Sequence, residues 1–201
     1  MANVDDVVLI RNFLDGDVGS FNRLAWRWQE RLFQFAYRYL MDEEDAKEAV
    51  QTVLIKVYKY LKKLKDPEKF SSWIYQITIN QCRDFRKSAK KNQMHPFTEE
   101  LTAESVDAAY QSTVSRQLTP TESAHQKSLG ELIQMTLARL PEEQRIVIIM
   151  KEYDGFKFVE IAELLNVPIN TVKSRLYHGL MHMQKLLKQL NIDKEVMYDE
   201  L

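Results

Sequence analysis

Residues 158–187 read FVEIAELLNVPINTVKSRLYHGLMHMQKLL, two helical stretches separated by the residues NVP. A short helix, a three-residue turn and a longer helix that is basic near its start are typical of a helix-turn-helix. Ala162 permits close helix crossing, and Asn166 can adopt the left-handed conformation that ends the first helix. Pro168 or Asn170 can start the second helix. The stretch predicts a C-terminal DNA-binding motif in an all-α chain.

Upstream of this motif, the same helical domain extends back to Thr119-Pro120, where Pro suits the first position of a helix. A stripe at helical spacing follows, made of Leu129, Leu132, Ile133, Thr136, Leu137 and Leu140. Pro141 separates it from EEQRIVIIMKEY, a further helix that stops at Asp154 and Gly155. We therefore predict one domain over residues 119–190.

The N-terminal part of the chain predicts a second module, a bundle of four helices with short connections. Helical periodicity covers residues 4–14, 21–40, 42–61 and those from Phe70 onward. We expect Ser20 to cap the second helix and Asp42 the third. Pro67 breaks the third helix after its lysine-rich end. The fourth helix is expected to bury Trp73, Ile74, Ile77, Cys82 and Phe85.

Charge is distributed unevenly along the 201 residues, whose net charge is −1. Residues 1–91 carry 17 Lys or Arg against 13 Asp or Glu, and residues 131–190 carry 8 against 7. Residues 92–130 carry 2 against 5, and residues 191–201 carry 1 against 4. Two basic-to-neutral modules are thus joined by a polar, acidic linker at 92–118 and followed by an acidic tail. A nearly neutral total is compatible with DNA binding when positive charge lies on one face.

Cellular location is indicated by three features. The single cysteine, Cys82, excludes an internal disulfide framework and favours a reducing compartment. The N-terminus MANVDDVV lacks the basic and apolar segments of a signal peptide. No apolar run approaches the roughly 20 residues that cross a bilayer. We therefore expect a cytoplasmic protein without membrane insertion.

The order of these parts resembles the extracytoplasmic-function (ECF) sigma factors of the sigma-70 family. DEEDAKEAVQTVLIKVYKYL is similar to the family helix that docks on the RNA polymerase clamp. FSSWIYQITINQCRDFRKSAKK is similar to the helix that meets the −10 promoter element. LPEEQRIVIIMKEYDGFKFVEIAELL followed by NTVKSRL is similar to sigma region 4. The resemblance covers about residues 4–91 and 128–188, and implies sigma region 2 over 1–91 and region 4 over 119–190.

Four positions depart from the family pattern. Lys157 stands where many members have a capping Ser or Thr, and Asp84 stands where Asn is commoner. Asn166 and Asn170 replace frequent glycines. Since Asn tolerates left-handed and capping conformations, we expect the fold to survive these changes. Promoter preference does not transfer, because it depends on side chains that vary within the family.

The resemblance implies that the second helix of the helix-turn-helix reads the −35 element. Its N-terminal part would lie in the major groove, where each base pair presents a distinct pattern of donors and acceptors. The candidate contacts are Asn170, Thr171, Lys173, Ser174, Arg175, Tyr177 and His178. Arg175 can bind guanine or grip a phosphate, and the sequence leaves both open. Val172, Leu176 and Leu180 are expected in the core.

The resemblance also implies that residues 62–87 capture a melted strand of the −10 element. Lysines around Pro67 offer phosphates a cationic rim, and a snug pocket must offset the few kcal/mol that base flipping costs. The candidate residues are Lys63, Lys65, Lys69, Asn80, Arg83, Asp84 and Lys87. Trp73 is a core residue or a stacking platform, and its place in the apolar stripe favours the core.

Binding to the polymerase is expected on the outer face of the third helix. The candidate residues are Glu44, Glu48, Gln51, Thr52, Ile55 and Lys56. An apolar Ile55 on that face suits a partner helix, although an incidental exposed Ile is equally common on residue grounds. The partners that the resemblance implies are core RNA polymerase through its β′ clamp and β flap, promoter DNA and an anti-sigma factor.

No residue pattern predicts catalysis, a metal site or a cofactor. His178 and His182 lie one helical turn apart, but no nearby Cys or carboxylate completes a metal site. No phosphate-binding loop or nucleophile elbow is present in the sequence. The leading interpretation is an alternative sigma factor that is not itself an enzyme. Its rivals are a stand-alone helix-turn-helix regulator and a sigma-like interaction protein that binds no DNA.

Overall fold

The computed structural model describes residues 5–93 and 128–189, and every regular element in these two ranges is helical. The N-terminal module contains α1 (Asp6–Leu14), α2 (Val18–Leu40), α3 (Glu43–Tyr60), the 3₁₀ helices η1 (Leu61–Lys63) and η2 (Pro67–Lys69), and α4 (Phe70–Gln93). The C-terminal module contains α6 (Ser128–Ala138), α7 (Glu142–Ile148), the π-helix η3 (Ile149–Tyr153), α8 (Phe158–Leu165) and α9 (Ile169–Gln189). The predicted all-α class is confirmed.

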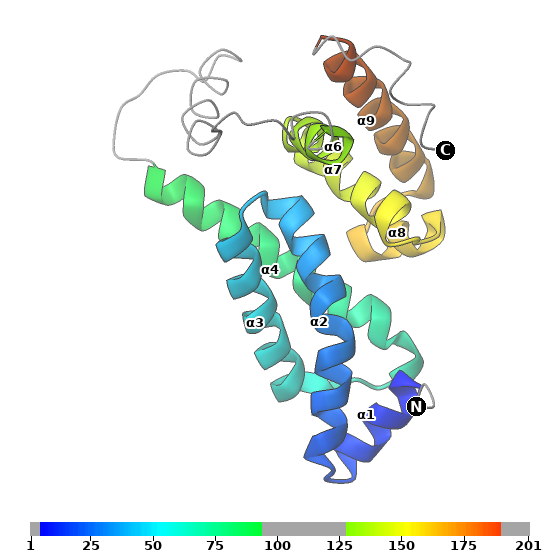
Figure 1. The fold of residues 1–201 in the computed structure, drawn as a ribbon. Coiled ribbons are helices and arrows are strands. Elements are labelled where there is room, and N and C mark those ends of the chain that lie inside the picture. The colour runs from blue at the N-terminus through cyan, green and yellow to red at the C-terminus, as the bar shows by residue number, and fades with distance from the viewer. Residues whose placement is uncertain (1–4, 94–127, 190–201) are drawn as a thin grey trace.

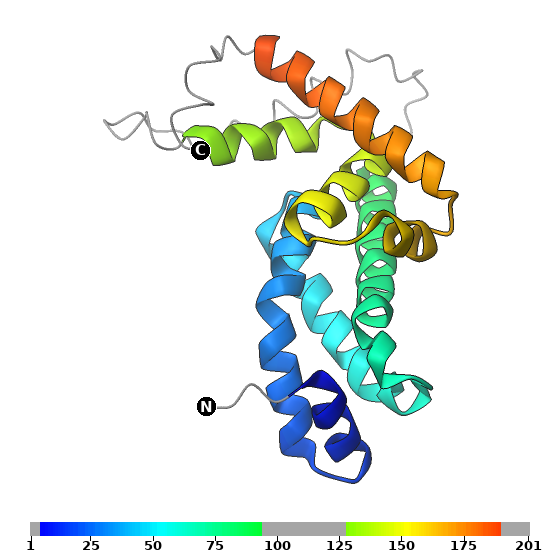
Figure 2. The ribbon, with the colours of Figure 1, turned by 90° about the vertical axis from the view of Figure 1, so that its right-hand side faces the viewer.

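The two modules pack directly against each other. Figure 1 and Figure 2 show an elongated N-terminal bundle with the C-terminal helices lying across one end and side of it. Contacts join α2 to α6 and η3, and α4 to α8. The predicted linker at 92–118, the helix start at Thr119-Pro120 and the acidic tail at 191–201 lie outside the described residues, apart from the last two residues of α4.

The start of α2 corrects one capping prediction. Asp17, and not Ser20, is the residue that precedes the helix, and Ser20 lies buried inside its first turn. The Ser20 hydroxyl donates to Asp17 Oδ2 at 2.5 Å, and this bond lowers the pKa of Asp17. Gly16 adopts φ 108°, a left-handed conformation that glycine adopts at little cost. The turn after α1 is therefore short, and α2 begins at Val18, before the predicted cap. Asp42 caps α3 as predicted, accepting from the Asp45 backbone N–H at 2.8 Å.

An aromatic core holds α2, α3 and α4 together. The helical periodicity predicted over residues 21–40 corresponds to a buried stripe of α2, whose members are Leu24, Trp28, Leu32, Phe35 and Tyr39. The Trp28 ring meets Phe70 and Tyr75 edge-on, at centroid distances of 5.5 and 6.1 Å. Burying one such side chain stabilises the fold by about 1.5–3 kcal/mol relative to leaving it exposed.

The buried face of α4 differs from the prediction. Ile74 and Cys82 are buried as expected, whereas Trp73, Ile77 and Phe85 are only partly buried. Tyr75 and Ile79 are fully buried instead. The reason is that α4 contacts α8 of the other module as well as α2 and α3, which shifts its covered face. Burial raises the pKa of the Cys82 thiol to about 12, which makes it unreactive.

Helix α7 and the π-helix η3 form the centre of the C-terminal module. Six consecutive residues, 145–150, are buried, although one stripe of a surface helix would bury only about half of them. Ile148 packs with Leu137, Leu140 and Met183 of its own module. Ile146, Val147, Ile149 and Met150 belong instead to the core that α2 and α4 share. This helix is therefore covered by both modules at once.

The helix-turn-helix is formed by α8 and α9. Asn166 adopts φ 52° and ψ 51° and ends α8, as predicted. Of the two predicted starts for α9, Pro168 is the one observed, because its carbonyl accepts from the N–H groups of Thr171 and Val172. Glu160 accepts from the Lys157 backbone N–H at 2.7 Å and supplies a cap that the Lys157 side chain does not.

One residue of α9 was wrongly predicted to be buried. Val172 is buried and Leu176 partly buried, but Leu180 is 45% exposed. A spacing of four rotates about 40° off a helix face at each step, so the buried line passes through Gly179 to Met183 instead. A Cβ at Gly179 would lie 2.7 Å from Ile148 Cδ1, which shows how closely α9 approaches α7.

Candidate nucleic-acid and polymerase interfaces

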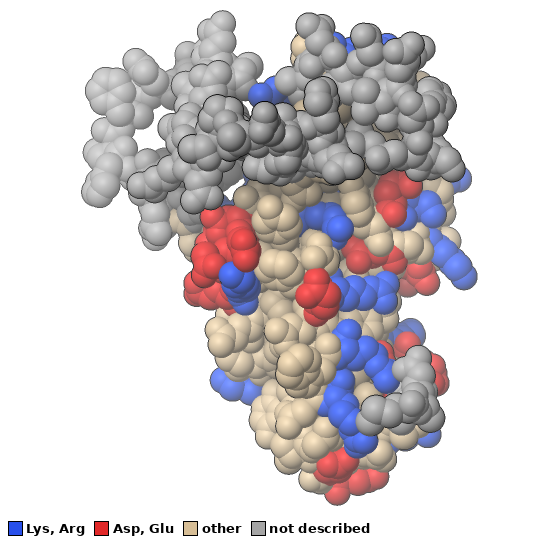
Figure 3. Space-filling model, viewed as in Figure 1, with Lys and Arg blue, Asp and Glu red and all other residues tan. Residues whose placement is uncertain are grey.

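A groove of about 980 Å³ runs between α2 and α3. Its lining comprises Gln29, Glu30, Phe33, Glu43, Glu44, Lys47, Glu48, Val50, Gln51 and Leu54. Figure 3 shows acidic side chains gathered over α3 beside an uncharged surface. An acidic rim over an apolar floor is suited to a helical partner that carries basic residues on its edge.

The groove contains half of the predicted polymerase contacts. Glu44, Glu48 and Gln51 line it, and Ile55 is 50% exposed on the same helix. Thr52 and Lys56 are half-buried, and the Lys56 ammonium donates to the Gln81 side chain on α4. Lys56 therefore turns away from the groove in the described structure.

Three groove residues from α2 were not predicted from the sequence. Gln29, Glu30 and Phe33 form the second wall. Phe33 stands next to the buried stripe residue Leu32, and an aromatic side chain one position off a buried stripe was the available signal. The sequence analysis missed Phe33 because only the packing of α2 against α3 shows which residues beside the buried stripe line the groove.

A second groove, of about 440 Å³, lies beside η2 and the start of α4. Lys65, Lys69 and Trp73 line it, together with Leu64, Asp66, Ser72 and Gln76. Trp73 is thus half-buried with one part facing the groove, so the core prediction for it is only partly right. Lys63 directly precedes the groove residues Leu64 and Lys65 in the sequence, and its ammonium lies 4.9 Å from the Tyr60 ring. The wall opposite η2 is formed by Glu163 and Leu164 of α8.

The remaining −10 candidates lie along α4. Asn80, Asp84 and Lys87 are exposed, and their spacing of four and three residues places them on one face of the helix. Arg83 shares their side of the helix but is half-buried, because it forms an ion pair with the other module. The structure therefore brings Lys65, Lys69 and Trp73 together in one groove and places the α4 residues further along the same helix.

The −35 candidates lie on the first turns of α9. Asn170, Lys173, Ser174 and His178 are exposed, and Tyr177 is 63% exposed. Thr171 is half-buried at the start of the helix. Arg175 is also half-buried, because its Nη2 lies 2.5 Å from Glu143 Oε2 on α7. The face thus carries the donors that major-groove reading requires, with one arginine already engaged.

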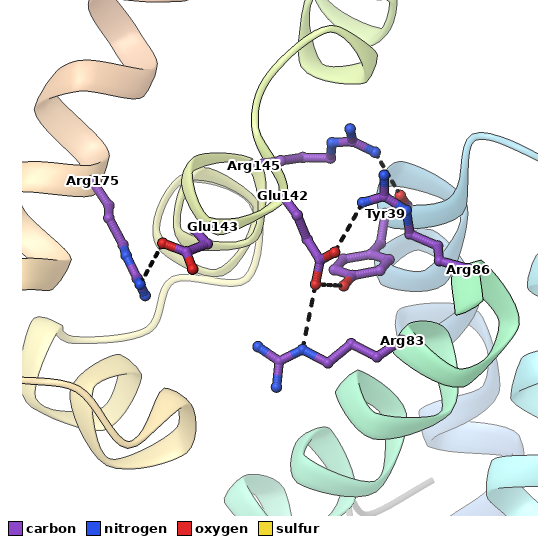
Figure 4. Close-up of polar contacts among 7 residues, drawn as sticks. All are labelled: Tyr39, Arg83, Arg86, Glu142, Glu143, Arg145 and Arg175. Carbon is purple, nitrogen blue, oxygen red and sulfur yellow. Dashed lines mark hydrogen bonds and ion pairs between the residues drawn. The ribbon is translucent and has the colours of Figure 1, made fainter. Parts of the chain in front are cut away.

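Glu142 forms the main polar contact between the modules (Figure 4). The Tyr39 hydroxyl donates to its Oε1 at 2.5 Å, and Arg83 and Arg86 lie 3.5 and 3.3 Å from its oxygens. Burial acts to raise the pKa of Glu142, but the bond from Tyr39 and the two arginines outweigh it and lower the pKa. Burial and the bond to Glu142 raise the pKa of Tyr39.

Arg145 forms a second contact across the module boundary. Its side chain is 5% exposed and donates to the carbonyls of Tyr39, Ala138 and Leu140 at 3.0, 2.8 and 3.0 Å. These carbonyls lie at the C-terminal ends of α2 and α6, where helices have unpaired acceptors and favour positive charge. One guanidinium therefore caps a helix of each module.

Asp154 forms a third contact. The buried Tyr75 hydroxyl donates to Asp154 Oδ1 at 2.6 Å, and Arg31 Nη2 donates to the Asp154 carbonyl at 3.1 Å. Burial raises the pKa of Asp154 despite the bond from Tyr75 and the charges of Arg31 and Arg38. The Phe156 ring packs edge-on against Tyr75 at 4.7 Å. These contacts seat the C-terminal module on α2 and α4.

Within residues 5–93 and 128–189, no three His, Cys, Asp or Glu side chains are arranged to hold a metal ion. His182 Nδ1 lies 2.8 Å from Gln144 Oε1 and its ring is exposed. In the same described ranges, no helix combines the length and the apolarity that crossing a bilayer requires.

Comparisons with known proteins place both modules. Residues 24–92 match the family Sigma-70 region 2, and residues 130–183 match the family Sigma-70, region 4. The chain is 28% identical over 181 residues to the ECF RNA polymerase sigma factor SigW of Bacillus subtilis, covering 90% of this chain and 96% of that protein. It is 26% identical over 174 residues to the ECF RNA polymerase sigma-E factor of Escherichia coli, covering 87% and 90%.

Two solved structures share the fold. CnrH, in complex with the cytosolic domain of CnrY, matches with a TM-score of 0.63 and 22% identity, over 92% of this chain and 97% of that one. The sigma factor RpoE of Bartonella quintana, in complex with the anti-sigma factor NepR, matches with a TM-score of 0.63 and 22% identity, over 88% and 100%. Because both sigma-70 regions occur in order and the relatives match along almost their whole length, the chain belongs to the sigma-70 family and is an ECF-type alternative sigma factor that directs transcription initiation.

Proposed function

We propose that three separate surfaces of this chain perform the three physical steps of promoter-specific initiation. The α2–α3 groove docks core RNA polymerase, the groove beside η2 captures a melted strand of the −10 element, and α9 reads the −35 element. Region 2 then spans residues 1–91 and region 4 spans residues 119–190. The observation that carries this proposal is that the three surfaces use different residues, so no side chain has to serve two of the three steps.

Docking is supported by the composition of the α2–α3 groove. Glu30, Glu44 and Glu48 provide a negative rim, while Phe33 and Leu54 provide apolar surface beneath it. Complementary charge raises the rate of encounter and fixes the register of a partner helix, and buried apolar contacts hold it. The clamp of the polymerase is the partner that sigma region 2 requires.

Promoter contact is supported by the chemistry of the other two surfaces. Lys65 and Lys69 can neutralise phosphates, and Trp73 offers an indole ring on which an unpaired base can stack. Lys173, Ser174 and Tyr177 are exposed on α9, where an inserted helix presents its first turns to base edges. Binding at both sites is expected to weaken steeply with salt, because each phosphate contact releases counterions.

The test of this function is in vitro transcription with core RNA polymerase and a genomic promoter library, with and without the full chain. We expect new start sites that depend on the protein and share upstream elements at two fixed distances. Absence of such start sites, together with tight binding to duplex DNA alone, would establish the stand-alone regulator instead. Absence of both would establish the interaction protein.

Regulation by an anti-sigma factor, a cytoplasmic location and the absence of intrinsic catalysis belong to the same proposal. A sigma factor solved with an anti-sigma factor has the fold of this chain, which supports an inhibitory partner here. Affinity purification of the tagged chain from cells should recover such a partner besides polymerase. Recovery of polymerase alone would contradict this part of the proposal.

A further inference from the structure

Four exposed side chains form one line along α9. They stand at positions i, i+3, i+4 and i+7, which share one face of a helix, and they are Ser174, Tyr177, His178 and Met181. Helices that read the major groove of DNA contact it with side chains at this same spacing. The predicted −35 contacts end at His178, so Met181 is the one member of the line without an assigned role.

Met181 contributes little to the packing of its own module. It is 50% exposed, whereas Met183 is buried in a cluster with Leu137 and Ile148. Two residues rotate about 200° around a helix, so Met181 points away from the module and Met183 points into it. Helix α9 contains no Asp or Glu, and its Lys173 is exposed, so the phosphate backbone of DNA meets no like charge on this helix. The line is therefore a surface suited to duplex DNA, with an apolar end at Met181.

We infer that Met181, together with Tyr177, reads the C5-methyl groups of thymines in the −35 element. The inference rests on the proposed function and names the chemistry that the later turns of α9 recognise. Thymine alone among the four bases presents a methyl group in the major groove, and apolar side chains contact that group. Ser174 and His178 offer hydrogen-bonding atoms to base edges, whereas the Met181 thioether and the Tyr177 ring offer apolar surface. The line thus reads hydrogen-bonding edges with two side chains and methyl groups with the other two.

Helix geometry sets the distance between the two thymines. The Tyr177 ring lies edge-on to the His178 ring, with centroids 5.7 Å apart, and this contact restricts where the Tyr177 ring points. Met181 follows one turn later, about 6 Å further along the helix axis. Phosphates repeat about every 3.4 Å along one strand, so a helix that lies along the groove places the two side chains about two base pairs apart. The element should therefore contain two thymines, on either strand, at about that spacing.

The test is selection from a random-sequence duplex library by the full chain bound to core RNA polymerase. The library is made twice, once with thymidine and once with deoxyuridine, which lacks only the C5-methyl group. We expect wild type to enrich thymine at two positions of the upstream element in the first library. At each of them, the preference should be about fourfold weaker in the deoxyuridine library, because that is the contribution of burying one methyl-sized group.

Leu180 provides a matched control for Met181. It is apolar and 45% exposed, but it lies about 100° around the helix from Met181 and therefore beside the line. Met181→Ala should remove the thymine preference at one position of the thymidine library and change nothing in the deoxyuridine library. Tyr177→Ala should act in the same way at the other position. Leu180→Ala should select the wild-type sequences from both libraries, because a general loss of apolar surface on α9 does not remove a methyl contact.

The outcomes separate this inference from the proposed function. Equal preference for thymine and uracil in wild type would overturn the inference, and so would a Met181→Ala variant that selects like wild type. In both cases the enriched upstream element would leave the proposed function standing. Failure of the wild-type complex to enrich any upstream element would overturn the inference and the proposed reading of the −35 element together.

Discussion

The two sides of the N-terminal module differ in whether the C-terminal module packs against them. Among the described residues, those that line the α2–α3 groove all belong to the N-terminal module. The α4 side contacts the C-terminal module through Arg83, Arg86 and Tyr75. The groove proposed to dock polymerase is thus uncovered, while Arg83, proposed to contact DNA, forms an ion pair with the other module. The two sides therefore differ in whether the C-terminal module covers them, and four measurements test this difference.

Replacement of Arg145 by Ala is expected to have the largest effect. The variant leaves the carbonyls of Tyr39, Ala138 and Leu140 without their buried cationic donor. The free energy of unfolding should fall by about 2–4 kcal/mol, measured by urea denaturation. Arg139→Ala, at an exposed position on the same connection, is the control and should change it by less than about 0.5 kcal/mol. Equal effects would show that this contact between α2 and the C-terminal module stabilises the fold no more than an exposed side chain does.

Gly179→Val tests the packing of α9 on α7 without touching either side of the N-terminal module. A Cβ there meets Ile148 Cδ1 at 2.7 Å and Gln144 Cβ at 3.2 Å. Overpacking should lower the free energy of unfolding by about 1–3 kcal/mol, seen in thermal denaturation. Gly130→Ala, where nothing lies within 4 Å of the added Cβ, should instead be neutral or stabilising by up to about 1 kcal/mol. Unchanged stability of the Gly179→Val variant would show that α9 shifts freely, and with it Arg175.

Charge reversal at Glu48 tests the open groove. Because Glu48 contributes to the acidic rim, Glu48→Lys should weaken binding of core polymerase about tenfold, measured by fluorescence anisotropy of the labelled chain. Asn22→Lys adds a positive charge at an exposed position of α2 outside the groove. Its affinity for core polymerase should stay within about twofold of wild type. If both variants bind like wild type, the groove is not the docking surface and the comparison fails.

The smallest effect concerns pH. Burial raises the pKa of Asp154, so the folded chain binds a proton there more tightly than the unfolded chain does. This group contributes most stability below the usual carboxyl pKa, and the contribution is lost as pH rises through the raised pKa. Asp154→Asn removes the titration while Tyr75 keeps an acceptor. The urea midpoint of the variant minus that of wild type should therefore increase from about pH 4 to about pH 7, and a constant difference would contradict the assignment.

The residue pattern within short stretches of the sequence determined most of the secondary structure. The stripe of α2, the Asp42 cap and the left-handed Asn166 follow from periodicity and short-range hydrogen bonding, and the structure confirms them. Such features depend on residues within one or two turns of each other, so the sequence displays them directly. The exposed faces of α9 and of the later part of α4 were predictable for the same reason. The capping prediction for Ser20 was wrong because a positive φ at Gly16 moved the helix start.

Packing between elements decided what the sequence leaves open. The six buried residues 145–150, the partly exposed Trp73 and the exposed Leu180 depend on which helices cover each face. Likewise, the α2 wall of the groove and the pairing of Glu142 with Arg86, 56 positions away in the chain, exist only once the elements meet. Burial and long-range ion pairs are properties of neighbours in space, whereas helical periodicity is a property of neighbours in sequence. The family and the all-α fold could therefore be predicted from the sequence, and the packing of the two modules against each other could not.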